Sequence, residues 1–239
     1  MLLALQPAIF YNEGTMCGRF TITLEPAAWQ EEFDLHTITV DWKINYNTAP
    51  TQMVPVVIDE QSRTVEMMRW GLIPFWAKDE TIGSRLINAR AETLAEKPSF
   101  RAAFQQRRCL ILADGFYEWQ KGSTAKAPKV PYYFHLRDHK PFFFAGLWES
   151  WRPSKDAPPV HSCTIITTTP NSLVGEMHNR MPVILDKSTC WAWLLEKDAA
   201  ALAELLVPYP ADSMLAYPVS TAINNSVNNS PQNIQPLSY

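Results

Sequence analysis

A cysteine near the start of the chain carries its most distinctive chemistry. Cys17 follows Met16 in the run TMCGRF, so a start or a cleavage at Met16 would leave Cys17 at the amino terminus once the methionine is removed. An N-terminal cysteine bears a thiol and an α-amine on neighbouring carbons. The amine forms an imine with an aldehyde and the thiolate then closes a thiazolidine ring, since reference pKa values of about 8 and about 8.5 leave both groups reactive. Inside an ordinary strand the same dipeptide would have no chemical role.

Two other side chains suit acid–base chemistry. Glu118 lies between Tyr117 and Trp119 near the end of an apolar run, and a carboxylate beside aromatic rings can have a raised pKa. Simple strand alternation would instead place Glu118 in water. His178 precedes Pro182 and a strand-like segment. A histidine at such a junction either transfers protons near neutral pH or merely caps the chain at the surface.

An amide and a guanidinium lie two residues apart at Asn88 and Arg90. Residues at this spacing on an extended segment face the same way, and this pair suits orienting a substrate and holding a phosphate. An ordinary salt bridge from Arg90 to Glu92 would explain the same pattern. Both interpretations stay open from the sequence.

The overall charge does not indicate a nucleic-acid partner, because the net charge is −3 and the sequence pI is about 6.0. A local basic cleft remains compatible with these values. Seven arginines lie between residues 63 and 108, interleaved with Trp70, Phe75 and Trp76. Arginines follow a phosphate backbone and flat rings stack on bases, although the acidic residues of the same stretch also fit a mixed surface.

Strand-like segments dominate the chain, and helical segments are inserted between them. This order predicts an α+β fold, a single domain around a curved, barrel-like, mainly antiparallel β core with inserted helices. The expected strands are Gln52–Asp59, Thr64–Ile73, Arg108–Gln120, Pro131–Leu136, Pro141–Trp151, Cys163–Thr168 and Met181–Leu185. The expected helices are Pro26–Leu35, Ala91–Gln106 with a break near Pro98, Ser172–Met177 and Ser188–Leu206.

Composition and cysteine content bear on the size of the core, the state of the thiols and the expected location of the protein. The 239 residues are 46% hydrophobic, enough for a sizeable core. Four cysteines without a CxxC pair predict reduced thiols, a cytoplasmic location and no metal site. Residues 1–15 lack a basic region before their short apolar run, so we expect a leader or an upstream start rather than a signal peptide or membrane span. The run Lys121–Lys129 is expected to be a hairpin loop, and the segment after Asn224 a loop or tail.

Taken in order, segments along nearly the whole chain from Met16 resemble the SRAP (SOS response-associated peptidase) family. They are MCGRF at 16–20, YNTAP at 46–50, RWGLIP at 69–74, NARAET at 88–93, ADGFYEW at 113–119, FAGLWE at 144–149, TIITT at 164–168 and HNRMP at 178–182. The resemblance implies an SRAP domain over residues 16–239, preceded by the leader at 1–15. It also implies a single α+β domain around a barrel-like β core.

The resemblance further implies that the protein binds single-stranded DNA and cross-links to abasic sites through an N-terminal cysteine. Carried over by position, the catalytic residues would be Cys17, Asn88, Glu118 and His178, and the DNA contacts would be Arg19, Pro50, Trp70 and Arg90. The expected partner is single-stranded DNA containing abasic sites. No cofactor, metal or membrane is expected, and the protein is expected to be a monomer.

The implied reaction assigns a step to each group. His178 would help open the sugar ring, Glu118 would deprotonate the amine of Cys17 and later protonate the departing hydroxyl, and Asn88 would hold the deoxyribose. One alternative is an autoprocessing cysteine peptidase that removes residues 1–15, with Cys17 as nucleophile and His178 as base. The other is a non-catalytic reader of modified bases in DNA.

Overall fold

The computed structural model describes residues 17–36, 38–40, 42–120 and 128–237. The predicted leader at residues 1–15 lies outside the described residues, as does most of the loop predicted at Lys121–Lys129. The strands on either side of that loop pair antiparallel, as a hairpin requires. Among the described residues, no helix is long and apolar enough to cross a membrane.

A closed barrel forms the centre of the fold. Its strands are β3 (Met53–Val57), β4 (Val65–Trp70), β6 (Arg108–Ala113), β9 (Phe142–Trp151) and β10 (Val160–Thr168). They run in the order β10-β4-β3-β6-β9, and β9 pairs again with β10 to close the ring. All neighbours are antiparallel except β4 and β10. Three short strands extend this sheet: β5 (Asn88–Arg90) and β11 (Met181–Pro182) on β10, and β12 (Ile184–Leu185) on β9.

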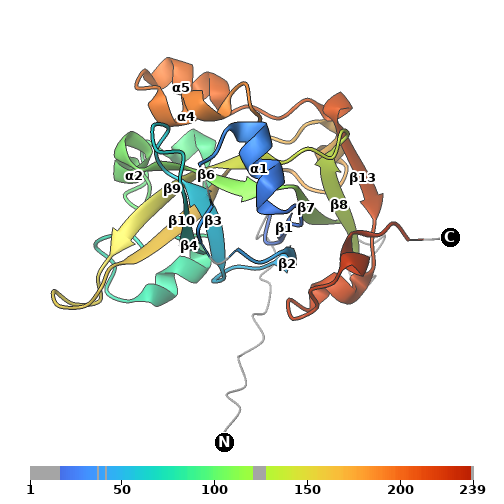
Figure 1. Cartoon of the computed structure of the whole chain (residues 1–239), viewed down its shortest axis with the longest axis horizontal. Helices are drawn as coiled ribbons and strands as arrows, with labels where there is room; N and C mark the ends of the chain where they lie inside the picture. Colours follow the sequence, from blue (N-terminus) through green and yellow to red (C-terminus); the bar gives the residue numbers. More distant parts are fainter. Residues whose placement is uncertain (1–16, 37, 41, 121–127, 238–239) are drawn as a thin grey trace, which may run out of the picture.

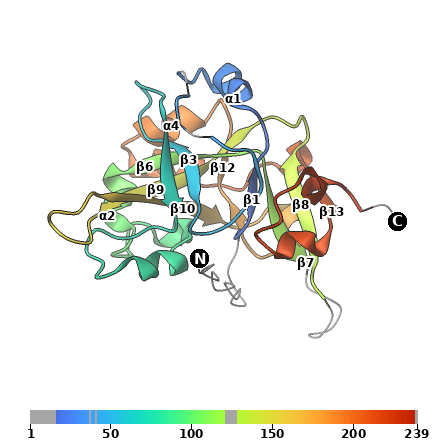
Figure 2. The same cartoon turned by 60° about the horizontal axis from the view of Figure 1, so that its bottom comes forward.

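A second, five-stranded antiparallel sheet stands beside the barrel (Figure 2). Its order is β13-β8-β7-β1-β2. The strands are β1 (Phe20–Ile22), β2 (Asn45–Thr48), β7 (Gly115–Gln120), β8 (Val130–Leu136) and β13 (Met214–Pro218). The fold is therefore α+β on a barrel-like, mainly antiparallel core, as the sequence predicted.

Short helices cover the outer face of the barrel. They are α1 (Pro26–Phe33), α2 (Arg101–Gln106), α4 (Cys190–Leu195) and α5 (Ala199–Leu205). A further short helix, α3 (Ser172–Gly175), instead packs Val174 into the buried cluster between the barrel and the five-stranded sheet. Figure 1 shows α1, α4 and α5 gathered on one side of the molecule. The 3₁₀ turns are η1 (Glu80–Arg85), η2 (Ala91–Thr93), η3 (Ala211–Ser213), η4 (Thr221–Asn224) and η5 (Pro231–Ile234).

The run of aromatic residues in β9 explains how barrel and helices hold together. Successive side chains of a strand point to opposite faces. Phe142 and Phe144 therefore join the inner cluster that links the barrel to the five-stranded sheet, whereas Phe143 packs outward among α1 and α4. Its ring lies 4.3 Å from the ring of Phe33 in α1. Full burial of each such side chain stabilises the fold by roughly 1.5–3 kcal/mol.

Four expected elements are divided in the structure, and one of them is the strand expected at Met181–Leu185, which becomes β11 and β12. The strand expected at Arg108–Gln120 becomes β6 and β7, because Asp114 turns the chain and its carboxylate accepts hydrogen bonds from Thr21 Oγ1 and the backbone nitrogen of Leu24. The helix expected at Ser188–Leu206 becomes α4 and α5, since Asp198 caps α5 by accepting from the backbone nitrogens of Ala200 and Ala201. The helix expected at Ala91–Gln106 is reduced to η2 and α2.

Candidate active site

Cys17 and Glu118 meet where β1 pairs with β7. The register Phe20↔Phe116 carries the residues before β1 alongside the end of β7. There the backbone nitrogen of Cys17 donates a hydrogen bond of 2.8 Å to Oε1 of Glu118. Both residues are buried, so Glu118 is not the water-facing residue that strand alternation would give. The structure thus brings together the predicted nucleophile and the predicted base.

Burial dominates the electrostatics of this pair. It raises the pKa of the Glu118 carboxyl to about 8, against the smaller opposite effect of the hydrogen bond from Cys17. Burial, with the neighbouring Glu118 charge, also raises the pKa of the Cys17 thiol well above its usual range. The thiol is therefore protonated at neutral pH, and the nitrogen of Cys17 is the atom that Glu118 serves directly. Cys17 also has φ of +41°, a conformation that is uncommon for a residue with a Cβ.

Asn88 and Arg90 lie on β5, which pairs in parallel with β10. The register sets Asn88 beside Ile165 and Arg90 beside Thr167. Asn88 is half-buried and Arg90 is exposed, so Arg90 is the more accessible of the two to solvent. Both residues come from one face of a three-residue strand, as their spacing predicted.

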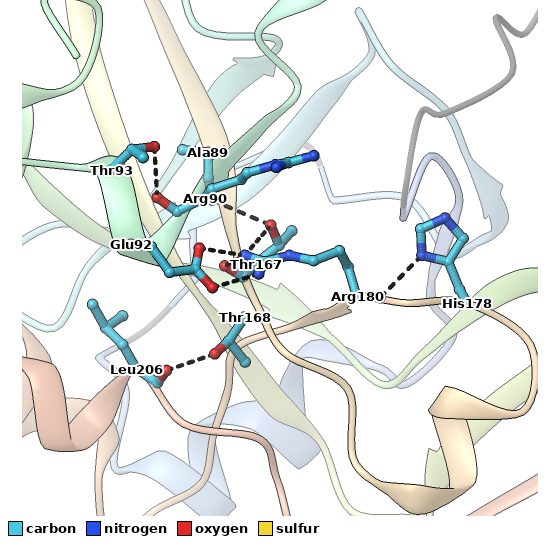
Figure 3. Close-up of polar contacts among 9 residues, drawn as sticks. All are labelled: Ala89, Arg90, Glu92, Thr93, Thr167, Thr168, His178, Arg180 and Leu206. Atoms are coloured by element: carbon cyan, nitrogen blue, oxygen red, sulfur yellow. Dashed lines mark hydrogen bonds and ion pairs between the residues drawn. The ribbon is translucent and has the colours of Figure 1, made fainter. Parts of the chain in front are cut away.

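His178 follows α3 and leads into β11, which lies on the opposite edge of β10 from β5. Its backbone nitrogen donates to the carbonyl of Val174 at 2.9 Å, which closes the last turn of α3. Its ring Nδ1 accepts a hydrogen bond of 3.2 Å from the backbone nitrogen of Arg180 (Figure 3). The next strand, β11, pairs with β10 through Thr167 and Thr168, so the His178 segment is fixed across β10 from β5.

The inner cluster connects these parts of the site. Ile87 precedes Asn88 and Met177 precedes His178, and both belong to the same buried cluster as Cys17. Trp70 spans the distance between β1 and β5: its Nε1 donates to the carbonyl of Ile87 at 3.0 Å, and its ring meets the Phe20 ring edge-on at 5.0 Å. Trp70 is fully buried, so in this structure it supports the site from within.

Arg19 and Pro50 lie at the β1–β2 side of the site. Arg19 is 4% exposed, and its guanidinium donates to Asn47 Oδ1 at 2.8 Å and to the carbonyls of Ile223 and Asn224 at 2.6 and 3.2 Å. The segment expected to be a loop or tail is thus fastened next to β1. Pro50 is half-buried in the turn after β2. Contacts of Arg19, Pro50, Trp70 and Arg90 with DNA stay predictions.

Several residues with evident roles were missed from the sequence. Glu92 forms its ion pair with Arg180 rather than with Arg90, and Asn47 receives Arg19. Glu92, Arg180 and Asn47 lie in the segments NARAET, HNRMP and YNTAP, respectively. These segments carry the family resemblance, and that resemblance could have identified the three residues from the sequence. Of the aromatic residues interleaved with the arginines, Phe75 and Trp76 are the exposed ones, at 61% and 47%.

The groups of the candidate site can supply acid–base and nucleophilic chemistry. Within the described ranges, no three His, Cys, Asp or Glu side chains come together as metal ligands. A buried carboxyl beside the nitrogen of a cysteine, a histidine, an amide and an exposed guanidinium form a constellation suited to imine chemistry on an aldehyde attached to an anionic chain.

Comparisons with known proteins identify the family of this chain. The family model described as SOS response associated peptidase (SRAP) matches residues 16–226, and the chain belongs to this family. It is 45% identical over 225 residues to the abasic site processing protein YoqW of Bacillus subtilis (strain 168), covering 92% of this chain and 99% of that protein. It is 31% identical over 216 residues to the abasic site processing protein HMCES of Xenopus tropicalis, covering 79% of this chain and 64% of that protein.

A solved structure shows the same fold. A crystal structure of a protein from Bacteroides thetaiotaomicron superposes with a TM-score of 0.83 at 28% sequence identity. The alignment covers 93% of this chain and all of that one, 100%. The barrel with its adjoining sheet is therefore the architecture of the SRAP family.

Proposed function

We propose that this protein is an abasic site processing protein that binds single-stranded DNA and forms a covalent thiazolidine with abasic sites through an N-terminal Cys17. The observation that carries the proposal is the 2.8 Å contact between the Cys17 nitrogen and Glu118 Oε1. The names of the related proteins support the same substrate class. We further propose that it acts as a monomer in the cytoplasm.

The reaction joins one aldehyde to one cysteine with loss of one water. His178 helps open the closed sugar by proton transfer to the ring oxygen. Glu118 takes a proton from the amine of Cys17, whose nitrogen adds to the aldehyde carbon, and then returns a proton to the departing hydroxyl. The sulfur adds to the imine carbon and the thiol proton passes to the nitrogen. The ring holds the lesion as a stable adduct.

Positioning explains why a thiol with a raised pKa suffices. Amine and thiol belong to one residue, so the second bond forms at a high effective concentration. Asn88 is placed to hold the deoxyribose, and Arg90 to hold a flanking phosphate because its guanidinium is exposed beside it. Both come from β5, which lies across β10 from the segment that carries His178.

The test is intact mass spectrometry of a protein beginning at Cys17, incubated with an oligonucleotide that contains one abasic site. We expect a denaturation-resistant species whose mass is the sum of both molecules less one water. Cys17→Ala should abolish it. Cys17→Ser should give only an imine that requires borohydride to trap. Cys163→Ala removes an equally buried thiol and should leave the adduct intact. A stable adduct from Cys17→Ala would reject the proposal and favour another nucleophile.

A second candidate function is self-processing between Met16 and Cys17. The observation in its favour is the same contact, because the nitrogen that would depart lies 2.8 Å from a carboxyl group whose pKa of about 8 keeps it largely protonated at neutral pH. Water would supply the hydroxyl group of the new carboxyl terminus at Met16, and the departing nitrogen of Cys17 would keep the proton donated by Glu118. Intact mass of the full chain without DNA tests it: loss of residues 1–16, abolished by Glu118→Ala, would support this activity.

A further inference from the structure

Both terminal nitrogens of the Arg180 guanidinium form hydrogen bonds next to the candidate site. One terminal nitrogen of its guanidinium donates to Glu92 Oε1, and the other lies 2.9 Å from Glu92 Oε2 (Figure 3). The second nitrogen also donates to the carbonyl of Thr167 at 2.6 Å. A guanidinium and a carboxylate bound through two parallel hydrogen bonds fix each other in orientation as well as distance.

The pair joins two parts of the chain that carry the candidate catalytic residues. Glu92 lies in η2, directly after the strand of Asn88 and Arg90. Arg180 directly precedes β11. Between them runs β10, whose Thr167 is registered with Arg90 on one side and with Pro182 on the other. The ion pair therefore bridges the segment of Asn88 to the segment of His178 across the end of β10.

The backbone of Arg180 acts on the imidazole itself. Its N–H donates to Nδ1 of His178 at 3.2 Å. A nitrogen that accepts carries no proton, so the neutral ring keeps its proton on Nε2. Because the side chain of Arg180 is anchored to Glu92 and Thr167, this N–H is held at a fixed place. The tautomer and the direction of the His178 ring thus depend on an anchor two residues away.

Electrostatics keep this anchor intact over the working range of pH. The hydrogen bonds from Arg180 hold the pKa of the Glu92 carboxyl below its usual range, with a smaller contribution from the charge of Arg90. Thr167 presents only its carbonyl and hydroxyl to Arg180, so no further titrating group meets the pair there. The carboxylate stays ionised at neutral pH and the pair does not titrate where the proposed reaction runs.

We propose that Glu92 and Arg180 are positioning residues, whose ion pair fixes the backbone N–H of Arg180 and through it the His178 ring for proton transfer to the closed sugar. This inference rests on the proposed function of His178. It assigns to Glu92 a role in rate and not in DNA binding, because both oxygens of its carboxylate are bound to Arg180.

The test compares Glu92→Gln with Glu96→Gln, an exposed carboxylate of the same segment. With a closed abasic site, Glu92→Gln should form the adduct about 10-fold to 100-fold more slowly, since small misplacements of catalytic groups cost this much. With an oligonucleotide aldehyde that cannot cyclise, both variants should react like the parent. Affinity for a tetrahydrofuran abasic analogue should be unchanged. In a His178→Ala background, Glu92→Gln should cause no further loss.

Nitrogen NMR of the His178 ring supplies a readout that does not depend on the reaction. The parent should show the Nε2-protonated tautomer, Glu92→Gln a mixture of tautomers, and Glu92→Asp an intermediate effect that also controls for folding. Equal slowing on both aldehydes, additive loss with His178→Ala, or altered affinity for the analogue would overturn the positioning role. Absence of any adduct from the parent would instead reject the proposed function, while the NMR result would still decide the anchor.

Discussion

The backbone nitrogen of Cys17 lies 2.8 Å from Oε1 of Glu118, inside the protein and at the junction of β1 and β7. In the proposed reaction, this contact makes the nitrogen of Cys17 the first nucleophile. The thiol is kept protonated by burial, whereas the nitrogen faces the carboxyl group of Glu118. The proposed order of bond formation is therefore nitrogen before sulfur.

The state of the Cys17 nitrogen should change the pKa of Glu118. The pKa of about 8 belongs to a carboxyl that receives an amide N–H. A protein that begins at Cys17 places an ammonium group there, and a positive charge at this distance favours the carboxylate. We expect a lower Glu118 pKa in that protein than in one with an acylated Cys17. Carbon NMR of the labelled carboxyl measures both; an equal or higher value in the former would contradict the contact.

The same carboxyl predicts how stability depends on pH when Cys17 is acylated. The folded pKa is raised, from 4.5 to about 8, so folded protein retains a proton that unfolded chain has lost. The free energy of unfolding should therefore fall as pH rises between these values, by about 1.4 kcal/mol per pH unit from this group. Glu118→Gln should remove that contribution. Urea unfolding of both proteins at several pH values tests it, and parallel pH curves would show that Glu118 is not buried as a neutral acid.

The sequence pattern by itself did not predict the contact between Cys17 and Glu118. Cys17 and Glu118 could be paired only through the resemblance, since alternation along a strand placed Glu118 in water. The structure buries it because β7 is covered on both faces, by the inner cluster at Phe116 and by Val219 and Ile223 at Tyr117.

The other features that the sequence did not predict depend on contacts between residues far apart in the chain or on very short strands. Arg19 finds its acceptors at Ile223 and Asn224, more than 200 positions away, and no local pattern encodes such a contact. β1 has only 3 residues and the polar β2 only 4, too few for a periodic signal. The barrel strands, with their long apolar runs, were predicted from the same rules.

Asn47 should be essential for holding the C-terminal segment. Its side-chain amide accepts from Arg19 and donates to the carbonyls of Ile223, Asn225 and Asn228. Asn47→Ala removes one acceptor of Arg19 and one donor to each of these carbonyls, so the free energy of unfolding should fall by about 1–3 kcal/mol.

Hydrogen exchange locates the effect of this substitution. Amides of residues 221–234 should exchange faster in Asn47→Ala than in the parent protein. Val227→Ala, which trims a side chain that is 82% exposed in the same segment, should change neither measurement. Uniformly faster exchange over the whole chain, without a local excess, would contradict the assignment.

Arg90 should contribute one phosphate contact. Arg90 is exposed on the same strand as Asn88, and this strand lies across β10 from the segment of His178. Arg90→Ala should weaken binding to single-stranded DNA of any sequence and reduce the slope of log affinity against log salt by about 0.7. Fluorescence anisotropy at several salt concentrations measures the slope. Arg101→Ala, an exposed arginine at the start of α2, serves as control; an equal change in both would mean that only net charge matters.

Trp70 and Trp76 should separate support of the site from contact with DNA. Trp70 is fully buried and binds the carbonyl of Ile87, so Trp70→Phe should lower the free energy of unfolding by about 1–3 kcal/mol and slow adduct formation without weakening DNA binding. Trp76 is 47% exposed, so Trp76→Ala should leave stability unchanged and weaken single-strand binding by about 1–3 kcal/mol through loss of base stacking. Thermal unfolding and anisotropy with the tetrahydrofuran analogue distinguish the two. If Trp70→Phe instead weakened binding at unchanged stability, Trp70 would contact DNA directly, as the family resemblance implies, and the indole would have to leave the core when the strand binds.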